Sequence, residues 1–248
     1  MNEIMIKFIL GTEPKLVHEK VVLAPCWHPD SVGIQSANAF DDSNKIWDCS
    51  LNGEKFTYIV TGVGAGICLD VVMALSYTGC KNILFIGSAG ALKSGINIGD
   101  IAFPTEVLCA EGASRYLNQN IKNDALWKKY YVDISKIDNY INFLANNLTY
   151  DSKNIHVGRG VSVESLLTEY NHMEKFVEKK CDFIDMESSA FLATCEQSNI
   201  NATIVYCISD NVAQGEPLYS VLPEMVDYRK KIRKSVFPYI IEHFLRGD

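Results

Sequence analysis

The chain has 248 residues, of which 48% are hydrophobic and 21% charged, and its formal net charge is −7. This length and composition allow a sizeable hydrophobic core and predict one α/β domain over residues 1–248. Nucleic-acid binding is not expected, because a phosphate backbone attracts surfaces with an excess of lysine and arginine.

We expect neither a secretion signal nor a membrane span. The opening MNEIMIKFIL is short for a signal peptide and places acid and base close together. The least polar window, 56–80, is interrupted by Gly62, Gly64 and Gly66, which favours strand, loop and helix over a membrane span. Eight cysteines occur singly without a C-x-x-C pair, which favours buried free thiols over zinc or disulfides. A cytoplasmic location is therefore expected.

In chain order, short runs rich in β-branched residues predict strands at 4–10, 56–61, 82–87, 154–158 and 203–208. Apolar residues at helical spacing predict helices at 65–79, 134–147, 169–180, 187–199 and 223–245. The basic cluster RKKIRK, at 229–234, is interpreted as the solvated face of the last helix. This alternation predicts a mostly parallel or mixed sheet with helices on both faces.

Ligands of open α/β sheets bind beyond the carboxyl ends of strands, so residues that follow the predicted strands are candidates for a site. The stretch TGVGAGICLDVVMAL, at 61–75, is either a tight turn or an anion site built from free backbone N–H groups. Ile67 occupies the third glycine position of the G-x-G-x-x-G pattern, which argues against a Rossmann-type oxidoreductase.

The stretch NILFIGSAGAL, at 82–92, ends its strand in Gly87-Ser88-Ala89-Gly90. Small residues and one hydroxyl form either a plain turn or a nest for a phosphate or sugar oxygen. No lysine follows in the P-loop arrangement, so a nucleoside triphosphate is not expected.

Acids follow two further strands. In CDFIDMESSAF, at 181–191, Asp182 is expected at the surface and Asp185 as a helix cap, whereas Glu187 is placed to accept hydrogen bonds from a vicinal diol. In TIVYCISDN, at 203–211, Asp210 ends a hydrophobic strand. It either starts a turn or, if burial raises its pKa, donates a proton to a leaving group.

Together, GVGAG, GSAGAL, DMESSAF and CISDN, in this order and spacing, resemble the nucleoside phosphorylase and nucleosidase family from about residue 55 onward. The segment GDIAFPTEVLCAEGAS, at 99–114, is also similar to a strand and loop of that family. The resemblance implies a three-layer α/β/α fold whose mixed sheet tends to close into a barrel. It also implies a homodimer or a hexamer built as a trimer of dimers, with no metal or redox cofactor and with phosphate or water as second substrate.

By position, the resemblance assigns Glu187 to the ribose hydroxyls and Met186 to packing beneath the sugar. Asp210 matches the aspartate that protonates or hydrogen-bonds a purine at N7. The remaining assignments are to the base pocket, Val161 and Ile184, and to phosphate or sugar, Ser88, Gly87 and Gly11.

The chain departs from the family at the phosphate site. Phosphorolytic members carry arginines after the first strand and just before the G-S/T-x-G turn, where this chain has ILGTEPKLV and Phe85. Arg115 and Arg159 are the candidate substitutes, in this chain or from a neighbouring subunit. The arginine that assists the catalytic aspartate in some members is replaced by Pro223, and the nearest arginine is Arg229.

The leading hypothesis is a purine nucleoside phosphorylase-like enzyme with inorganic phosphate as co-substrate, since uridine-type members usually lack the aspartate of SDN. Hydrolysis is the alternative, in which Glu13 lies near the place of the glutamate that activates water in methylthioadenosine nucleosidases. A nucleoside-binding protein without turnover is the third possibility, raised by the missing arginines.

Overall fold

The computed structural model describes residues 2–41, 43, 45–118, 126–148 and 154–247. The strands are β1 (Lys20–Ala24), β2 (Ser36–Ala39), β3 (Ile46–Leu51), β4 (Glu54–Val60), β5 (Asn82–Ala91), β6 (Ile101–Ala110), β7 (Lys129–Tyr131), β8 (Ile155–Val163), β9 (Phe183–Asp185) and β10 (Asn201–Asn211). The helices are α1 (Glu3–Leu10), α2 (Ala65–Leu75), α3 (Ile134–Asn147), α4 (Met173–Glu178), α5 (Ser188–Ser198) and α6 (Pro223–Arg246).

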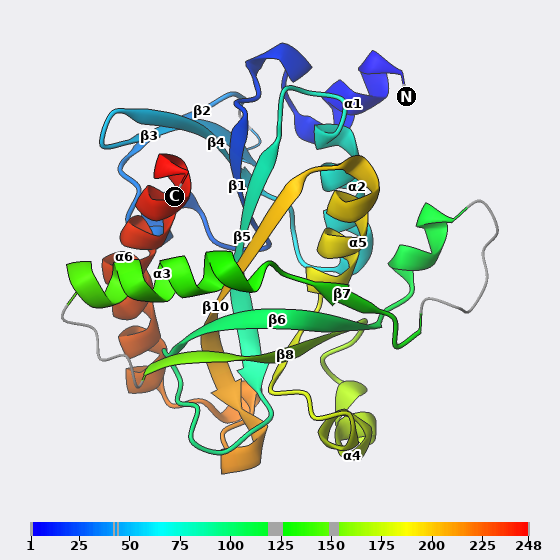
Figure 1. Ribbon diagram of the computed structural model, residues 1–248, viewed down its shortest axis with the longest axis vertical. Coiled ribbons are helices and arrows are strands. Elements are labelled where there is room, and N and C mark those ends of the chain that lie inside the picture. Colours follow the sequence, from blue (N-terminus) through cyan, green and yellow to red (C-terminus); the bar gives the residue numbers. More distant parts are fainter. Residues whose placement is uncertain (1, 42, 44, 119–125, 149–153, 248) are drawn as a thin grey trace.

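Strand β5 is the centre of one mixed sheet, whose strand order is β10-β6-β8-β9-β5-β1-β4-β3-β2, with β7 paired to β6. Strand β10 pairs with β5 as well as with β6, so β5, β10, β6, β8 and β9 form a closed ring of strands. The sheet is therefore a barrel at one end and opens at the other into the flat part formed by β1 to β4 (Figure 1).

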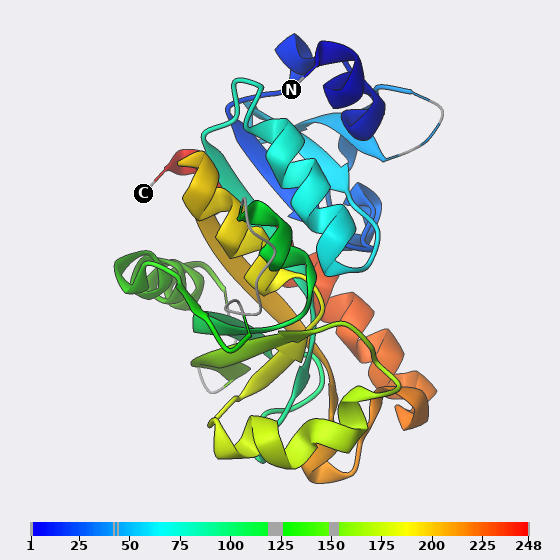
Figure 2. The same ribbon diagram turned by 90° about the vertical axis from the view of Figure 1, so that its right-hand side faces the viewer.

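Helices cover the sheet on both faces. In Figure 1, α2 and α5 lie on one side of β1, β5 and β10, and α6 lies on the other; Figure 2 looks onto α2 and α5. Helix α2 packs beside α5, and α3 packs against α6. The predicted mixed α/β architecture is confirmed. Among the described helices, none is long and apolar enough to cross a membrane.

The predicted strand at 4–10 is wrong, because these residues form helix α1. The Asn2 side chain caps this helix by accepting from the Ile4 amide at 3.0 Å, and Gly11 ends it in the left-handed conformation. Only Ile6 and Leu10, four residues apart, are buried, so the apolar run has one inward helical face. The first strand of the sheet is β1, which the sequence patterns did not identify.

The other predicted strands are confirmed, but three of them continue further. Strand β5 runs to Ala91, β8 to Val163 and β10 to Asn211. The motifs expected to follow strands β5 and β10 therefore lie within the last residues of these strands. The helix predicted at 134–147 is confirmed at both ends, with Asp133 capping its start. The helix predicted at 169–180 is instead a 3₁₀ turn, η6 (Glu169–His172), followed by the short α4.

The segment after β1 is seated directly on α6. The 3₁₀ turn η2 (Pro29–Val32) ends at Gly33, which has φ +80°. A Cβ on Gly33 would lie 2.7 Å from both the Lys234 carbonyl oxygen and Pro238 Cγ. Pro238 has no N–H to bond the carbonyl four residues earlier, which leaves this part of α6 accessible to the loop. Gly33 therefore fixes the distance between α6 and the residues that follow β1.

We predict that Gly33→Ala lowers the free energy of unfolding by about 2–4 kcal/mol, since it adds a steric clash to left-handed backbone strain. Gly53→Ala is the matched control, because Gly53 has φ +88° and no atom within 4 Å of its Cβ position. That variant should lose only the conformational part, about 1–2 kcal/mol. Urea denaturation of both variants measures the difference, and equal losses would contradict the packing argument.

Candidate active site

A cavity of about 440 Å³ lies at the carboxyl ends of β5, β9 and β10. The loop after β1 contributes Pro25 and Cys26, and the segment between β8 and α4 contributes Leu166, Leu167, Glu169 and Tyr170. Helix α6 contributes Arg229. Motifs that are far apart in the sequence therefore meet in one hollow at the strand ends, where ligands of α/β sheets bind.

Glu187 is a buried carboxylate bound by the glycine-rich loop. The Gly64 amide, at the start of α2, donates to Glu187 Oε1 at 2.6 Å. Gly64 has φ +122°, a conformation that side chains rarely adopt, and this conformation turns its N–H toward the acid. Burial, followed by the charge of Asp185, raises the pKa of Glu187 to about 8. The glycine-rich loop therefore uses a free backbone N–H to bind the protein's own Glu187 side chain.

Asp185 caps the following helix, as the sequence predicted. Its Oδ2 accepts from the Ser188 amide at 2.8 Å and from the Ser188 hydroxyl, and its Oδ1 accepts from Ser162 Oγ at 2.5 Å. The Tyr206 hydroxyl donates to Ser188 Oγ at 2.7 Å. These bonds tie the β9–α5 junction to β8 and β10 and so hold Met186 and Glu187 at the cavity.

Asp210 reaches the cavity through a bulge in β10. The register with β5 shifts between Ile208, opposite Ala89, and Asp210, opposite Gly90, so Ser209 is the extra residue. Ser209 Oγ donates to Asp210 Oδ1 at 2.5 Å. A Cβ on Gly90 would lie 3.1 Å from Asp210 Oδ2, so a glycine leaves the space that the carboxylate occupies.

Burial raises the pKa of Asp210, whereas Ser209 and the nearby Arg229 lower it. The net shift is upward, which favours the protonated acid relative to an exposed aspartate. A buried carboxyl with a raised pKa holds its proton to higher pH than an exposed aspartate and can donate it to a ligand atom.

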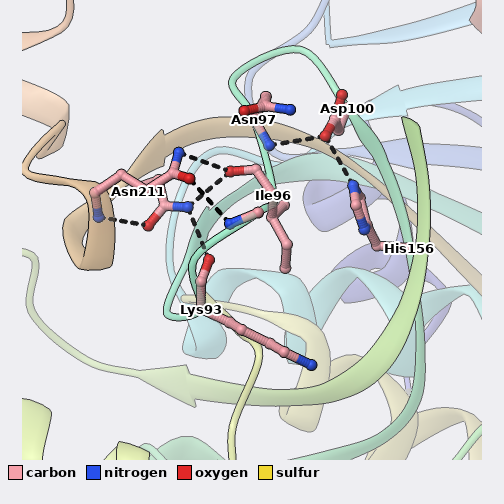
Figure 3. A network of polar contacts seen from close by, with 8 residues as sticks. Lys93, Ile96, Asn97, Asp100, His156 and Asn211 are labelled. Atoms are coloured by element: carbon pink, nitrogen blue, oxygen red, sulfur yellow. Dashed lines mark hydrogen bonds and ion pairs between the residues drawn. The ribbon is translucent and has the colours of Figure 1, made fainter. Parts of the chain in front are cut away.

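Asn211, the next residue, holds the loop that follows β5. Its Nδ2 donates to the carbonyl oxygens of Lys93 at 2.9 Å and Ile96 at 2.7 Å (Figure 3). In the same network Asp100 accepts from the Asn97 amide at 2.7 Å and lies 2.7 Å from His156 Nε2. The end of β10 is therefore fixed from both sides, which limits the movement of Asp210.

Ser88, Ile184 and Met186, which the resemblance assigned to the substrate, also line the cavity. Gly87 lies in the same strand, directly before Ser88. Ser88 Oγ has no hydrogen-bond partner within the described part of the chain and is half-buried. Val161 differs from the expectation, because it is fully buried in the cluster beneath Ile184 and lines no part of the wall.

The proposed phosphate ligands Gly11, Arg115 and Arg159 are not brought to this cavity. Gly11 is the left-handed residue at the end of α1, so the error follows from reading 4–10 as a strand. Arg159 Nε donates to Glu106 Oε1 at 2.5 Å, and its guanidinium also donates to a backbone carbonyl. Arg115 lies in the 3₁₀ turn η3 (Ala113–Leu117), which packs against α5 and α2.

Two other sequence positions are explained by the structure. Phe85, at the place of a family arginine, is buried and packs on Phe191 with ring centroids 5.2 Å apart. Glu13, the candidate base for water, is ion-paired with Lys7 on the surface and does not line the cavity. Glu13 is therefore not positioned to activate a water molecule in this cavity.

Several residues of the cavity were not identified as site residues from the sequence, among them Cys26, Glu169 and Arg229. Cys26 follows the unrecognised strand β1, and Glu169 begins what looked like an ordinary helix. Arg229 belongs to the cluster interpreted as a solvated face, yet it is half-buried and its Nη1 donates to the Ser209 carbonyl at 3.0 Å. The four-residue spacing of Arg229 and Arg233 was the available signal, since it places both on one side of a helix.

Residues 30–244 match the sequence model of the family described as the phosphorylase superfamily. A guanosine phosphorylase from Halorubrum lacusprofundi is 25% identical over 175 residues, which cover 69% of this chain and 67% of that protein. A uridine phosphorylase from Haemophilus influenzae is 31% identical over 70 residues, 28% of each chain.

Solved structures with the same fold include two enzymes of different activity. A uridine phosphorylase from Vibrio fischeri superposes with a TM-score of 0.69 at 17% identity, covering 92% of this chain and 93% of that one. A 5′-methylthioadenosine/S-adenosylhomocysteine nucleosidase from Campylobacter jejuni gives a TM-score of 0.70 at 13% identity, covering 92% and 99%. At these identities the likeness shows the fold alone.

Glu169 generates a prediction about stability. Burial, followed by the charge of Asp210, raises its pKa to about 7, and its Oε2 has no partner in the described chain. The folded state therefore binds more protons than the unfolded state between about pH 4.5 and 7, so stability falls as pH rises through this window. Glu169→Gln removes the titration and should be more stable than wild type by about 1–2 kcal/mol at pH 8, with the difference vanishing near pH 4.5.

Urea unfolding at pH 5 and pH 8 measures this difference. Glu174→Gln, at an exposed position of the adjacent α4, is the control and should show no such dependence on pH. A difference between Glu169→Gln and wild type that is the same at both pH values would contradict the assignment.

Proposed function

Because the chain belongs to the phosphorylase superfamily, we propose that it cleaves the N-glycosidic bond of a purine nucleoside with inorganic phosphate as acceptor. The family resemblance carried by the four sequence motifs is confirmed by this membership. The observation that carries the proposal is the buried carboxyl of Asp210 in the same cavity as Glu187, Met186 and Ser88.

In the proposed reaction the C1′–N9 bond breaks and its electron pair leaves with the purine. The departing base gains negative charge, so a proton donated by Asp210 to N7 stabilises the transition state. The raised pKa of Asp210, caused by burial, supports this role because the acid must carry its proton before the bond breaks. An oxygen of phosphate forms the new bond to C1′, giving the purine and a ribose phosphate.

Glu187 is proposed to bind the ribose through its 2′ and 3′ hydroxyls, with Met186 beneath the sugar. The Gly64 amide donates to Oε1 of Glu187, and the backbone of Met186 also hydrogen-bonds this carboxyl. A carboxylate held in this way has acceptor sites left for a diol. The fixed position of Glu187 orients C1′ without a loss of side-chain freedom on binding.

A purine is favoured over a pyrimidine because a purine offers N7 as a proton acceptor for Asp210. The similarity to guanosine phosphorylase, at 25% identity, points in the same direction. Ile184 and the aromatic pair Tyr170 and Tyr219, whose ring centroids are 6.0 Å apart, offer apolar surface for a flat base.

Phosphorolysis is proposed ahead of hydrolysis. The Ser88 hydroxyl is free of hydrogen bonds in the described chain, and Arg229 brings a positive charge to the same cavity. Glu13 lies outside it.

We also propose a cytoplasmic homo-oligomer, a dimer or a trimer of dimers. Helix α1 supports self-association, because Ile4, Met5 and Phe8 are exposed side by side on it.

We expect Asp210→Asn to lower kcat for a purine nucleoside by about 10²–10⁴-fold, since the amide can hydrogen-bond N7 but is not acidic enough to transfer a proton to it. The wild-type rate should fall as pH rises through the pKa of Asp210, and the variant should lack this decline. Hydrolysis or phosphorolysis of 4-nitrophenyl β-D-riboside is the control, because its leaving group is stable without protonation and should be little affected. A similar loss with both substrates would argue against the acid role.

The acceptor is tested by base release from inosine, guanosine, adenosine, uridine and methylthioadenosine with and without phosphate. We expect purine release that requires phosphate and produces ribose 1-phosphate in equal amount. Release at the same rate without phosphate would replace this proposal by hydrolysis. Ligand binding without release from any of the five substrates would favour a nucleoside-binding protein.

A further inference from the structure

A second, larger hollow adjoins the cavity described above. Its volume is about 1320 Å³, and it lies between the segment after β1 and helix α6. The two hollows share Cys26, Ser88 and Arg229 in their walls. The larger hollow additionally contains Arg233 and Lys234, so positive charge gathers in the hollow that shares Ser88 with the cavity.

Arg233 is fixed without being neutralised. Its guanidinium lies over the Trp27 ring, 4.7 Å from the ring centroid. Its Nε is buried and has no hydrogen-bond partner within the described residues. Trp27 is itself held against Phe237, with ring centroids 5.4 Å apart. A stacked arginine of this kind loses little further freedom when it binds an anion.

Arg229, one helical turn earlier, is in a similar state. Its Nη1 donates to the Ser209 carbonyl, and its Nε is buried without a partner among the described residues. Neither arginine forms an ion pair with a carboxylate in the part of the chain that the structure describes, although Asp30 lines the larger hollow and Asp210 the smaller one. Burial and then the nearby Arg229 lower the pKa of Arg233, as expected for two neighbouring guanidinium groups.

Cys26 and Ser88 show where the missing counter-ion would lie. Burial and the charge of Glu187 raise the pKa of the Cys26 thiol, whereas Arg233 and Arg229 lower it, so Cys26 lies near the acid and both arginines. The Ser88 hydroxyl, at the same junction, is without a partner in the described chain. The junction between the two hollows therefore offers two guanidinium groups and one hydroxyl next to the proposed sugar site.

We propose that Arg229 and Arg233 of α6, together with Ser88, bind a phosphate dianion at the junction of the two hollows. Guanidinium groups hold phosphate oxygens by paired, charge-assisted hydrogen bonds. As the site of the acceptor, the assignment rests on the proposed function; as an anion site, it stands on the geometry alone. The last helix thus supplies the positive charge that Phe85 and the residues after β1 do not supply.

The contact of Gly33 with Lys234 and Pro238 explains how the site is held. It sets the loop after β1 against α6, so Trp27 and Cys26 lie opposite the arginines. Phosphate of two sources fits this chemistry, free inorganic phosphate or the phosphate ester of a nucleotide. Inorganic phosphate and a nucleoside 5′-monophosphate are therefore tested separately.

The experiment compares wild type with Arg233→Met, Arg233→Lys and Lys231→Met. Lys231→Met is the matched control, because it removes one charge from an exposed position of the same helix that lines neither hollow. Inorganic phosphate is titrated calorimetrically into each protein without nucleoside, and thermal unfolding checks that each variant is folded. We expect Arg233→Met to weaken phosphate binding by about 10–100-fold, Arg233→Lys to recover part of it, and Lys231→Met to match wild type.

Kinetics then distinguish the sources of phosphate. With nucleoside and free phosphate, Arg233→Met should raise the KM for phosphate and leave the KM for nucleoside nearly unchanged, which supports the acceptor site. Base release from a nucleoside 5′-monophosphate without free phosphate, lost in Arg233→Met, would support the anion site and overturn phosphate as acceptor. Phosphate binding that is unchanged in Arg233→Met, or equally weakened in Lys231→Met, would overturn the site itself even if base release requires phosphate.

Discussion

The parallel pairing of β5 with β10 is the interaction on which the site depends. The two strands run together from Asn82 and Asn201 to Ala91 and Asn211, in the middle of the sheet. Their shared carboxyl ends carry Ser88 on one strand and Asp210 on the other. The pairing is interrupted once, at Ser209, and this bulge turns Asp210 into the cavity while the strands on either side remain bonded. The same pairing closes the barrel, so the architecture and the site have one origin.

The acids at the cavity come from the sheet and its loops, whereas the arginines come from α6. Asp185, Glu187, Glu169 and Asp210 are all buried acids at or beside the cavity, and burial raises the pKa of each. The arginines stand on the side of α6, with unsatisfied Nε atoms. Among the described residues no ion pair joins these acids to Arg229 or Arg233, although Arg229 is close enough to lower the pKa of Asp210, so both sets remain available for a ligand. The cost is a site that is less stable than a hydrophobic core would be, as is common where function requires buried polar groups.

Sequence reasoning succeeded where the signal is local. Apolar residues at helical spacing were sufficient to predict α3, and the four motifs in order named Ser88, Met186, Glu187 and Asp210, which line one cavity. It failed at the N-terminus, where the apolar run at 4–10 suits a strand or a helix equally and only burial of Ile6 and Leu10 distinguishes them. This single error displaced the expected phosphate loop from the residues after β1 to Gly11.

The sequence by itself determined most of the alternation of strands and helices, the family and two of the acids that line the cavity, because these depend on short patterns within single segments. Only the tertiary structure decided that Val161 is buried behind the residues that line the cavity and that Arg159 is paired with Glu106. It also decided that Arg229 lines both hollows and Arg233 the larger one. The physical reason is that a side chain's partners are set by the packing of elements distant in sequence. Arg233 lies over Trp27, more than two hundred residues earlier, only because Gly33 seats the loop after β1 on α6.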